Sequence, residues 1–164
     1  MERINLSVDQ WIELVKSEDN INLPVWFQVV SSSMYPWIRA NKDKSMLVPI
    51  NSVELKIGDI VLFPVNSSRG DYCLHRIYKM DEERVQTMGD ANKVPDGWID
   101  KMSILGKAVM IQRGNLSIDC EAPKWVRRFR LWNQFWRIRP FMLRLVRIMG
   151  KCKRIFKMII NKQT

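Results

Sequence analysis

The feature that most constrains the fold is a succession of short apolar, β-branched segments separated by turn residues. Runs of this kind, bounded by Gly, Pro, Asn or Asp, are typical of β-strands joined by tight turns. Because there are many of them and little helix, we predict a mainly β body, a coiled, barrel-like antiparallel sheet. The predicted strands cover residues 25–30, 44–50, 60–65, 72–80 and 104–113, with a further short strand and a long polar loop within 81–100.

Helical patterns occupy both ends of the chain. Ser7 predicts the N-cap of a short helix over residues 8–17. From Lys124 onward the period is again helical, and Pro140 divides that region into two pieces. We therefore expect a body of residues 1–121 and a helical tail of residues 122–164. The apolar face of the first helix is formed by Val8, Trp11, Ile12 and Val15.

The positive charge of the protein is concentrated in the tail. The net charge is +10, yet residues 122–164 hold 13 Lys and Arg and no acidic residue, which leaves −3 for residues 1–121. Arg144 and Arg147 lie away from the apolar face of the second piece, so this piece is a basic amphipathic helix. That apolar face comprises Phe141, Leu145, Ile148, Met149, Cys152, Ile155, Phe156 and Ile159.

Such a tail predicts contact with an anionic membrane surface. Basic amphipathic helices lie in the interface plane, where Trp125, Trp132 and Trp136 suit the headgroup region. Packing of the tail on the body or on a protein partner is an alternative. Nucleic acid is a less favoured partner, because no reader module precedes the body.

Cysteine usage and hydropathy bear on the compartment. There are three cysteines, an odd count without C-x-x-C spacing, which favours a reducing compartment. The N-terminal residues include acids and no long apolar run, and no stretch of about 18 apolar residues occurs. We expect a cytoplasmic protein, with peripheral contact at the inner face of the cell membrane.

A candidate catalytic set begins with three consecutive serines in the stretch VVSSSMYPWI, residues 29–38. A serine hydroxyl becomes a nucleophile when a base such as His or Lys takes its proton. The one histidine, His75, lies in a predicted strand, and Asp90 and Asp96 follow in a loop that can reach its imidazole. A metal pair of Cys73 with His75 is not expected, since no further histidine or suitably spaced cysteine exists. We expect no cofactor.

The candidate residues lie within or near five short sequence motifs that together resemble a known family. In order, they are VVSSSMYPWI, LKIGDIVLF, LHRI, MGDANKVPD and ILGKAVMI, and they span roughly residues 25–111. Together they resemble the type I signal peptidases, in the Ser-His branch found in the endoplasmic reticulum, archaea and some Gram-positive bacteria. The resemblance implies a serine endopeptidase that cleaves leader or signal-like peptides.

The resemblance also implies a role for each matched residue. Ser33 would be the nucleophile, and His75 the base at a position where the bacterial housekeeping enzymes have Lys. Asp96 would orient the imidazole, with Asp90 as the second candidate. The hydroxyl of Ser31 would join the Ser33 backbone N–H in an oxyanion hole.

Further expectations concern the surroundings of the nucleophile. Met34 is expected to form a wall of the substrate groove. Ser31 and Ser33 are expected on one side of an extended chain, because strand side chains alternate with period two. Matched residues expected to hold the strands and the loop in place are Gly58, Asp59, Arg76 and Gly89.

Two departures from the family pattern affect the expected substrate. Family members carry a membrane anchor before the serine block, where this chain has a polar helix. The family also usually has Gly-Asp after the serine block, where this chain has RANKDKSMLV. We therefore expect cleavage of leader peptides at the cytoplasmic membrane surface. The alternative is a catalytically inactive, peptide-binding adaptor that the tail recruits to a membrane or nucleic acid.

Overall fold

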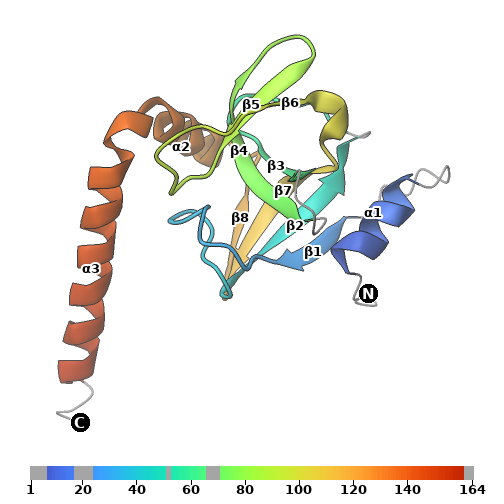
Figure 1. The fold of residues 1–164 in the computed structure, drawn as a ribbon. Coiled ribbons are helices and arrows are strands. Elements are labelled where there is room, and N and C mark those ends of the chain that lie inside the picture. The colour runs from blue at the N-terminus through green and yellow to red at the C-terminus, as the bar shows by residue number, and fades with distance from the viewer. Residues whose placement is uncertain (1–6, 17–23, 51–52, 66–70, 161–164) are drawn as a thin grey trace.

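The protein is mainly β, an eight-stranded antiparallel sheet curled into a half-barrel, as the computed structural model shows (Figure 1). The structure describes residues 7–16, 24–50, 53–65 and 71–160, without the side chains of 15–16 and 150–160. The strand order is β1-β2-β7-β3-β4-β5-β6, and β8 pairs with β7. The elements are α1 (Val8–Lys16), β1 (Val25–Gln28), β2 (Asp43–Pro49), β3 (Ile60–Pro64), β4 (Tyr72–Met80), β5 (Arg84–Met88), β6 (Trp98–Asp100), the 3₁₀ turn η2 (Lys101–Ser103), β7 (Gly106–Arg113), β8 (Leu116–Asp119), α2 (Pro123–Gln134), the 3₁₀ turn η3 (Trp136–Ile138) and α3 (Arg139–Ile160).

The fold class predicted from the sequence is confirmed, and β4 has the predicted bounds. Two strands were not predicted. β6 has only three residues, too few for a visible alternation. β8 follows a tight turn at Gly114, whose φ of 57° suits glycine, so β7 is not the last strand of the sheet.

The N-terminal helix begins where its capping residue predicts. The Gln10 N–H donates to Ser7 Oγ at 3.2 Å, and the Ser7 N–H donates to Gln10 Oε1 at 2.9 Å. Trp11 is buried and packs so closely on β7 that a Cβ on Gly106 would lie 2.6 Å from its ring. Glycine is therefore required at that position. The side chain of Val15 lies outside the described part of the chain.

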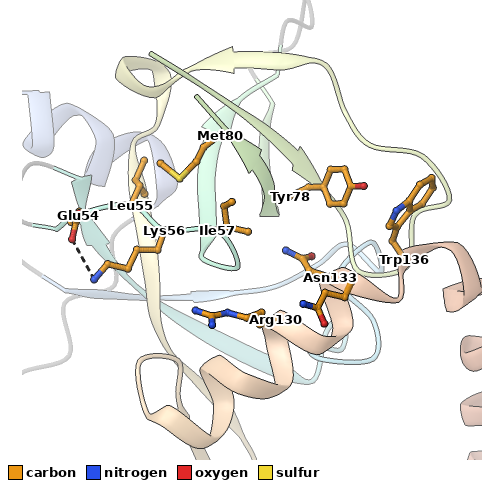
Figure 2. A pocket seen from close by; sticks show the side chains of 10 residues that line it. Glu54, Leu55, Lys56, Ile57, Tyr78, Met80, Arg130, Asn133 and Trp136 are labelled. Atoms are coloured by element: carbon orange, nitrogen blue, oxygen red, sulfur yellow. Dashed lines mark ion pairs between the residues drawn. The ribbon is translucent and has the colours of Figure 1, made fainter. Parts of the chain in front are cut away.

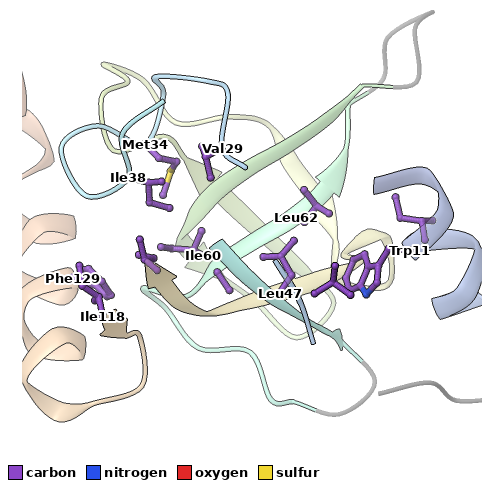
Figure 3. Packing of buried hydrophobic residues seen from close by; sticks show 13 residues of the cluster. Trp11, Val29, Met34, Ile38, Leu47, Ile60, Leu62, Ile118 and Phe129 are labelled. Atoms are coloured by element: carbon purple, nitrogen blue, oxygen red, sulfur yellow. The ribbon is translucent and has the colours of Figure 1, made fainter. Parts of the chain in front are cut away.

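The main hydrophobic core joins both ends of the chain to the sheet. Figure 3 shows Trp11 of α1 at one end of this cluster and Phe129 of α2 at the other. Met34 and Ile38, which follow β1, belong to the same cluster and lie above the strands in Figure 3. The first helix of the tail is thus part of the same core as the β body.

The last helix leaves this core. Pro140 is its second residue, and α3 runs away from the strands (Figure 1). Leu143 is buried, whereas Phe141, Leu145 and Ile148 on the other side of the helix are exposed. The remaining apolar residues predicted for this face, from Cys152 onward, lie outside the side chains that the structure describes. Among the described residues, no helix is long and apolar enough to cross a membrane.

Candidate active site

The three serines lie at the start of a turn that follows β1. The Tyr35 N–H donates to Ser32 O at 3.1 Å and the Ile38 N–H donates to Met34 O at 2.9 Å, so this segment is not extended as predicted. The hydroxyls of Ser31 and Ser33 nevertheless meet, with their oxygens 3.2 Å apart. The Ser33 N–H also donates to Ser31 Oγ at 3.2 Å. The turn, and not strand alternation, brings the two serines together.

The buried carboxylate of Asp43 is hydrogen-bonded to two arginines at the serine turn. Asp43 accepts from the backbone and guanidinium of Arg39 and from Arg113, which also donates to the carbonyls of Pro36 and Trp37. Burial opposes the charge of Asp43, but these hydrogen bonds outweigh burial and lower the pKa of its carboxyl.

The loop that follows the serine turn contains a non-glycine residue with a positive φ. Asn41 has a φ of 57°, in the left-handed region where glycine is usual and Asn is tolerated. Its N–H donates to Val29 O at 2.7 Å, which closes the loop after the turn. Asn41 therefore adopts a backbone conformation in which glycine is more common.

Met34 lies in the core and not in a groove. It is 1% exposed and packs with Val29 and Ile38 under the serine turn. The expectation that Met34 lines the substrate groove is thereby corrected. Its side chain points inward because residues 33–38 curl back on themselves, which places Ser33 outward and the next residue inward.

His75 lies on β4 with its imidazole almost wholly buried. Its Nδ1 is 2.6 Å from Asp96 Oδ2, and the same oxygen accepts from Thr87 Oγ1 at 2.7 Å. The Asp96 N–H donates to Thr87 O at 2.8 Å, so Thr87 of β5 binds both the backbone and the carboxylate of Asp96. Because a carboxylate can only accept, Nδ1 carries a proton, and in the neutral imidazole Nε2 is the nitrogen that can accept one.

Burial disfavours the charged form of this imidazole and lowers its pKa, but the hydrogen bonds to it raise the pKa by more. The bonds to Asp96 and to Cys73, two residues away on the same strand, raise the pKa of His75 to about 9. Cys73 was considered in the sequence only as a metal ligand. The period of two along a strand was the signal that could have placed it beside His75.

Asp90, the second candidate for the orienting acid, has another partner. It is fully buried and receives two hydrogen bonds from Arg76, at 2.9 and 2.8 Å. Arg76 also donates to Gly58 O at 2.7 Å. A buried guanidinium needs such a carboxylate, and the pair ties the turn before β3 to the loop after β5. Asp90 thus supports the backbone, and Asp96 contacts the imidazole.

A short turn after β5 contacts both the serine turn and His75. The Ala91 N–H donates to Ser33 O at 2.7 Å, which ties the serine turn to this segment. A Cβ on Gly89 would lie 2.9 Å from His75 Nε2, so the Gly89 backbone lies directly against this ring nitrogen. Residues 89–92, named the catalytic turn for the role proposed below, therefore contact both the serine turn and the imidazole.

A separate cavity of about 780 Å³ lies between β4, the segment before β3 and α2. Figure 2 shows Tyr78 and Trp136 on one side, with Arg130 and Asn133 projecting from α2. Neither Ser33 nor His75 lines it. Among the described residues, no group of three or more His, Cys, Asp and Glu side chains is placed to hold a metal ion.

No protein-family model and no curated protein matches this chain. The resemblance to type I signal peptidases remains a prediction from its five sequence blocks. The chemistry proposed below is argued from the contacts of Ser31, Ser33, His75 and Asp96 described above.

Proposed function

We propose that this protein is a serine endopeptidase that cleaves leader or signal-like peptides through an acyl-enzyme. The observation that carries the proposal is the pair of His75 and Asp96, in which Nδ1 is occupied by the carboxylate at 2.6 Å. The other ring nitrogen lies against the catalytic turn, which also binds the Ser33 backbone. A serine and an imidazole that both contact this turn, together with an orienting acid, are the parts that acyl transfer needs.

The reaction follows from these positions. Ser33 Oγ attacks the scissile carbonyl carbon and gives its proton to His75 Nε2, while Asp96 stabilises the imidazolium. His75 then passes that proton to the leaving amine as the C–N bond breaks and the acyl-enzyme forms. A water molecule then gives a proton to His75 and attacks the ester carbonyl. His75 passes that proton to Ser33 Oγ as the ester C–O bond breaks, which releases the acid product and regenerates Ser33.

The oxyanion would be held by the Ser33 N–H and the Ser31 hydroxyl. In the structure these groups are bonded to each other, at 3.2 Å. A substrate carbonyl oxygen would replace Ser31 Oγ as the acceptor of that N–H, and the Ser31 hydroxyl would turn to donate to the same oxygen. Each such donor contributes about 3 kcal/mol of transition-state stabilisation.

The substrate class comes from the resemblance and from α3. The family commonly prefers small residues before the scissile bond. The exposed apolar face of α3, with Arg144 beside it and no acidic residue anywhere in 122–164, suits an anionic membrane surface. We propose that leader peptides are cleaved at that surface on the cytoplasmic side.

The test is cleavage of leader-like peptides with small residues at varied positions, followed by mass spectrometry. Ser33→Ala should abolish cleavage. Ser32→Ala, which alters the exposed neighbouring serine, is the matched control and should cleave as the wild type does. Cleavage that persists in Ser33→Ala would refute the assignment. Binding of the peptides without any cleavage would favour the adaptor alternative.

A further inference from the structure

Arg139, the first residue of α3, is a buried cation that connects the tail to the site. It is 0% exposed. Its Nη1 donates to Gly89 O at 3.3 Å, its Nη2 to Asn133 Oδ1 at 2.9 Å and its Nε to Trp132 O at 3.2 Å. The guanidinium thus bridges the end of α2 and the catalytic turn.

Asn133, which accepts from Arg139, is also bonded to β4, the strand that contains His75. Its amide donates to Ile77 O at 2.9 Å, two residues beyond His75 on β4. Arg139 therefore acts on the site from two directions. It contacts Gly89, whose backbone lies against Nε2 of the imidazole, and it fixes the amide that is bonded to β4.

Helix α2, which carries Asn133, also packs against the serine turn. The ring of Trp37 packs edge-on against Trp125, Phe129 and Trp132, with centroids 6.1, 5.3 and 5.9 Å away. At its other end this turn is bonded to Ala91. Residues 125–139 consequently contact both the segment that carries Ser33 and the turn that meets His75.

We propose that Arg139 is a positioning residue that holds the catalytic turn in place between Ser33 and His75. This inference rests on the proposed peptidase function. A guanidinium suits the position because its planar fork can donate to three acceptors at once, which an ammonium on a single carbon chain does less well. The charged groups near it are Asp90, which is ion-paired with Arg76, and Arg76 itself, while Tyr78 is a further titratable neighbour.

Hydrogen exchange tests the holding role without requiring catalysis. In the full chain, Arg139→Met should speed exchange of the Ala91 amide at least about tenfold, because the turn loses its donor at Gly89 O. Arg139→Lys, which keeps the buried charge, should fold and show a smaller increase. Arg127→Met, an exposed arginine of α2, is the control and should exchange like the wild type. Unchanged protection of residues 89–92 in folded Arg139 variants would overturn the inference.

Labelling kinetics test the consequence for the chemistry. With a phosphonate probe for Ser33, Arg139→Lys should lower the maximal labelling rate between about tenfold and hundredfold, because small displacements of reacting groups are costly. The probe concentration for half-maximal rate should change little. An unchanged maximal rate in a folded variant would overturn the inference and leave the peptidase assignment standing. A wild type that is not labelled would refute the peptidase assignment alone, since the exchange result is independent.

Discussion

At the scale of single residues, the protonation of His75 affects stability and, in the proposed mechanism, controls activity. Its pKa in the folded protein is about 9, above the ordinary value of 6.5. The stabilisation from its ion pair with Asp96 is therefore fully present below pH 6.5 and is lost as the pH rises towards 9. The proposed catalysis needs the opposite state, because only the neutral imidazole can accept the Ser33 proton. Activity and stability should move in opposite directions over this range.

We expect the rate of Ser33 acylation to rise between pH 6.5 and 9, while the free energy of unfolding falls by roughly 3 kcal/mol. NMR titration of the imidazole gives the pKa directly, because His75 is the one histidine in the sequence. Asp96→Asn should lower that pKa and reduce the rate on the order of 10³- to 10⁴-fold. Thr87→Val, which removes the second donor to Asp96, should have smaller effects on both. A midpoint near 6.5 in the wild type would contradict this description of the pair.

The residue roles divide into those visible in the sequence and those set by tertiary contacts. Ser33, His75 and Asp96 stand in motif blocks, so local sequence was enough to propose them. The choice between Asp96 and Asp90 was left open, because it depends on which carboxylate Arg76 binds in the folded chain. Thr87 gave no signal, since its contact with Asp96 requires the pairing of β5 with the loop that follows it.

At the scale of elements, α2 is the helix that supports the site. Phe129 is 3% exposed, packs against Trp37 and lies with its ring 4.2 Å from the Arg76 guanidinium. These two contacts join the serine turn to the ion pair of Arg76 with Asp90. Trp132, predicted for the membrane headgroup region, is buried in the same cluster. The periodicity of this segment indicated a helix, but nothing local showed that Trp37 would cover its aromatic face.

Phe129→Ala should lower the free energy of unfolding by about 3–5 kcal/mol, because it leaves a cavity and removes the ring beneath Arg76. Phe135→Ala, which truncates a ring that is 49% exposed on the same tail, should cost less than about 0.5 kcal/mol. The midpoints of urea unfolding curves measure both. Equal losses in the two variants would mean that α2 does not share the core of the body.

Local pattern was sufficient for most strands and for the start of α1, where hydrophobic alternation and a capping serine act over a few residues. It was not sufficient for the serine turn. That segment was predicted to be extended, but Arg113, which lies opposite Asp43 on the neighbouring strand, binds Asp43 and two carbonyls of the turn. The two partners are 70 residues apart in the chain, so no window of sequence contains both.

At the scale of the whole molecule, charge and apolar surface are unevenly distributed. The body has a net charge of −3, and residues 122–164 carry 13 basic residues. α3 extends away from the sheet (Figure 1). The side chains of Phe141 and Ile148 on this helix are exposed. Because the start of α3 is fixed to the catalytic turn through Arg139, a membrane bound by this helix would have a defined position relative to the site.

Phe141→Ser together with Ile148→Ser should weaken binding to anionic vesicles more than about tenfold, since each buried apolar side chain contributes about 1.5–3 kcal/mol. Cosedimentation with phosphatidylglycerol-containing vesicles measures this. Met102→Ser, which alters an exposed methionine of the body, is the matched control and should bind as the wild type does. Equal binding by the double variant, or equal binding to uncharged vesicles, would contradict the membrane proposal.

The most direct measurement of the central claim is covalent labelling with a serine-directed phosphonate near pH 9, where half of the His75 imidazole is neutral. We expect a single adduct, located by mass spectrometry on Ser33. The adduct should be absent from Ser33→Ala and should form far more slowly in His75→Ala. An adduct that persists in Ser33→Ala, or one whose rate does not depend on His75, would contradict the claim that these two residues form the catalytic pair.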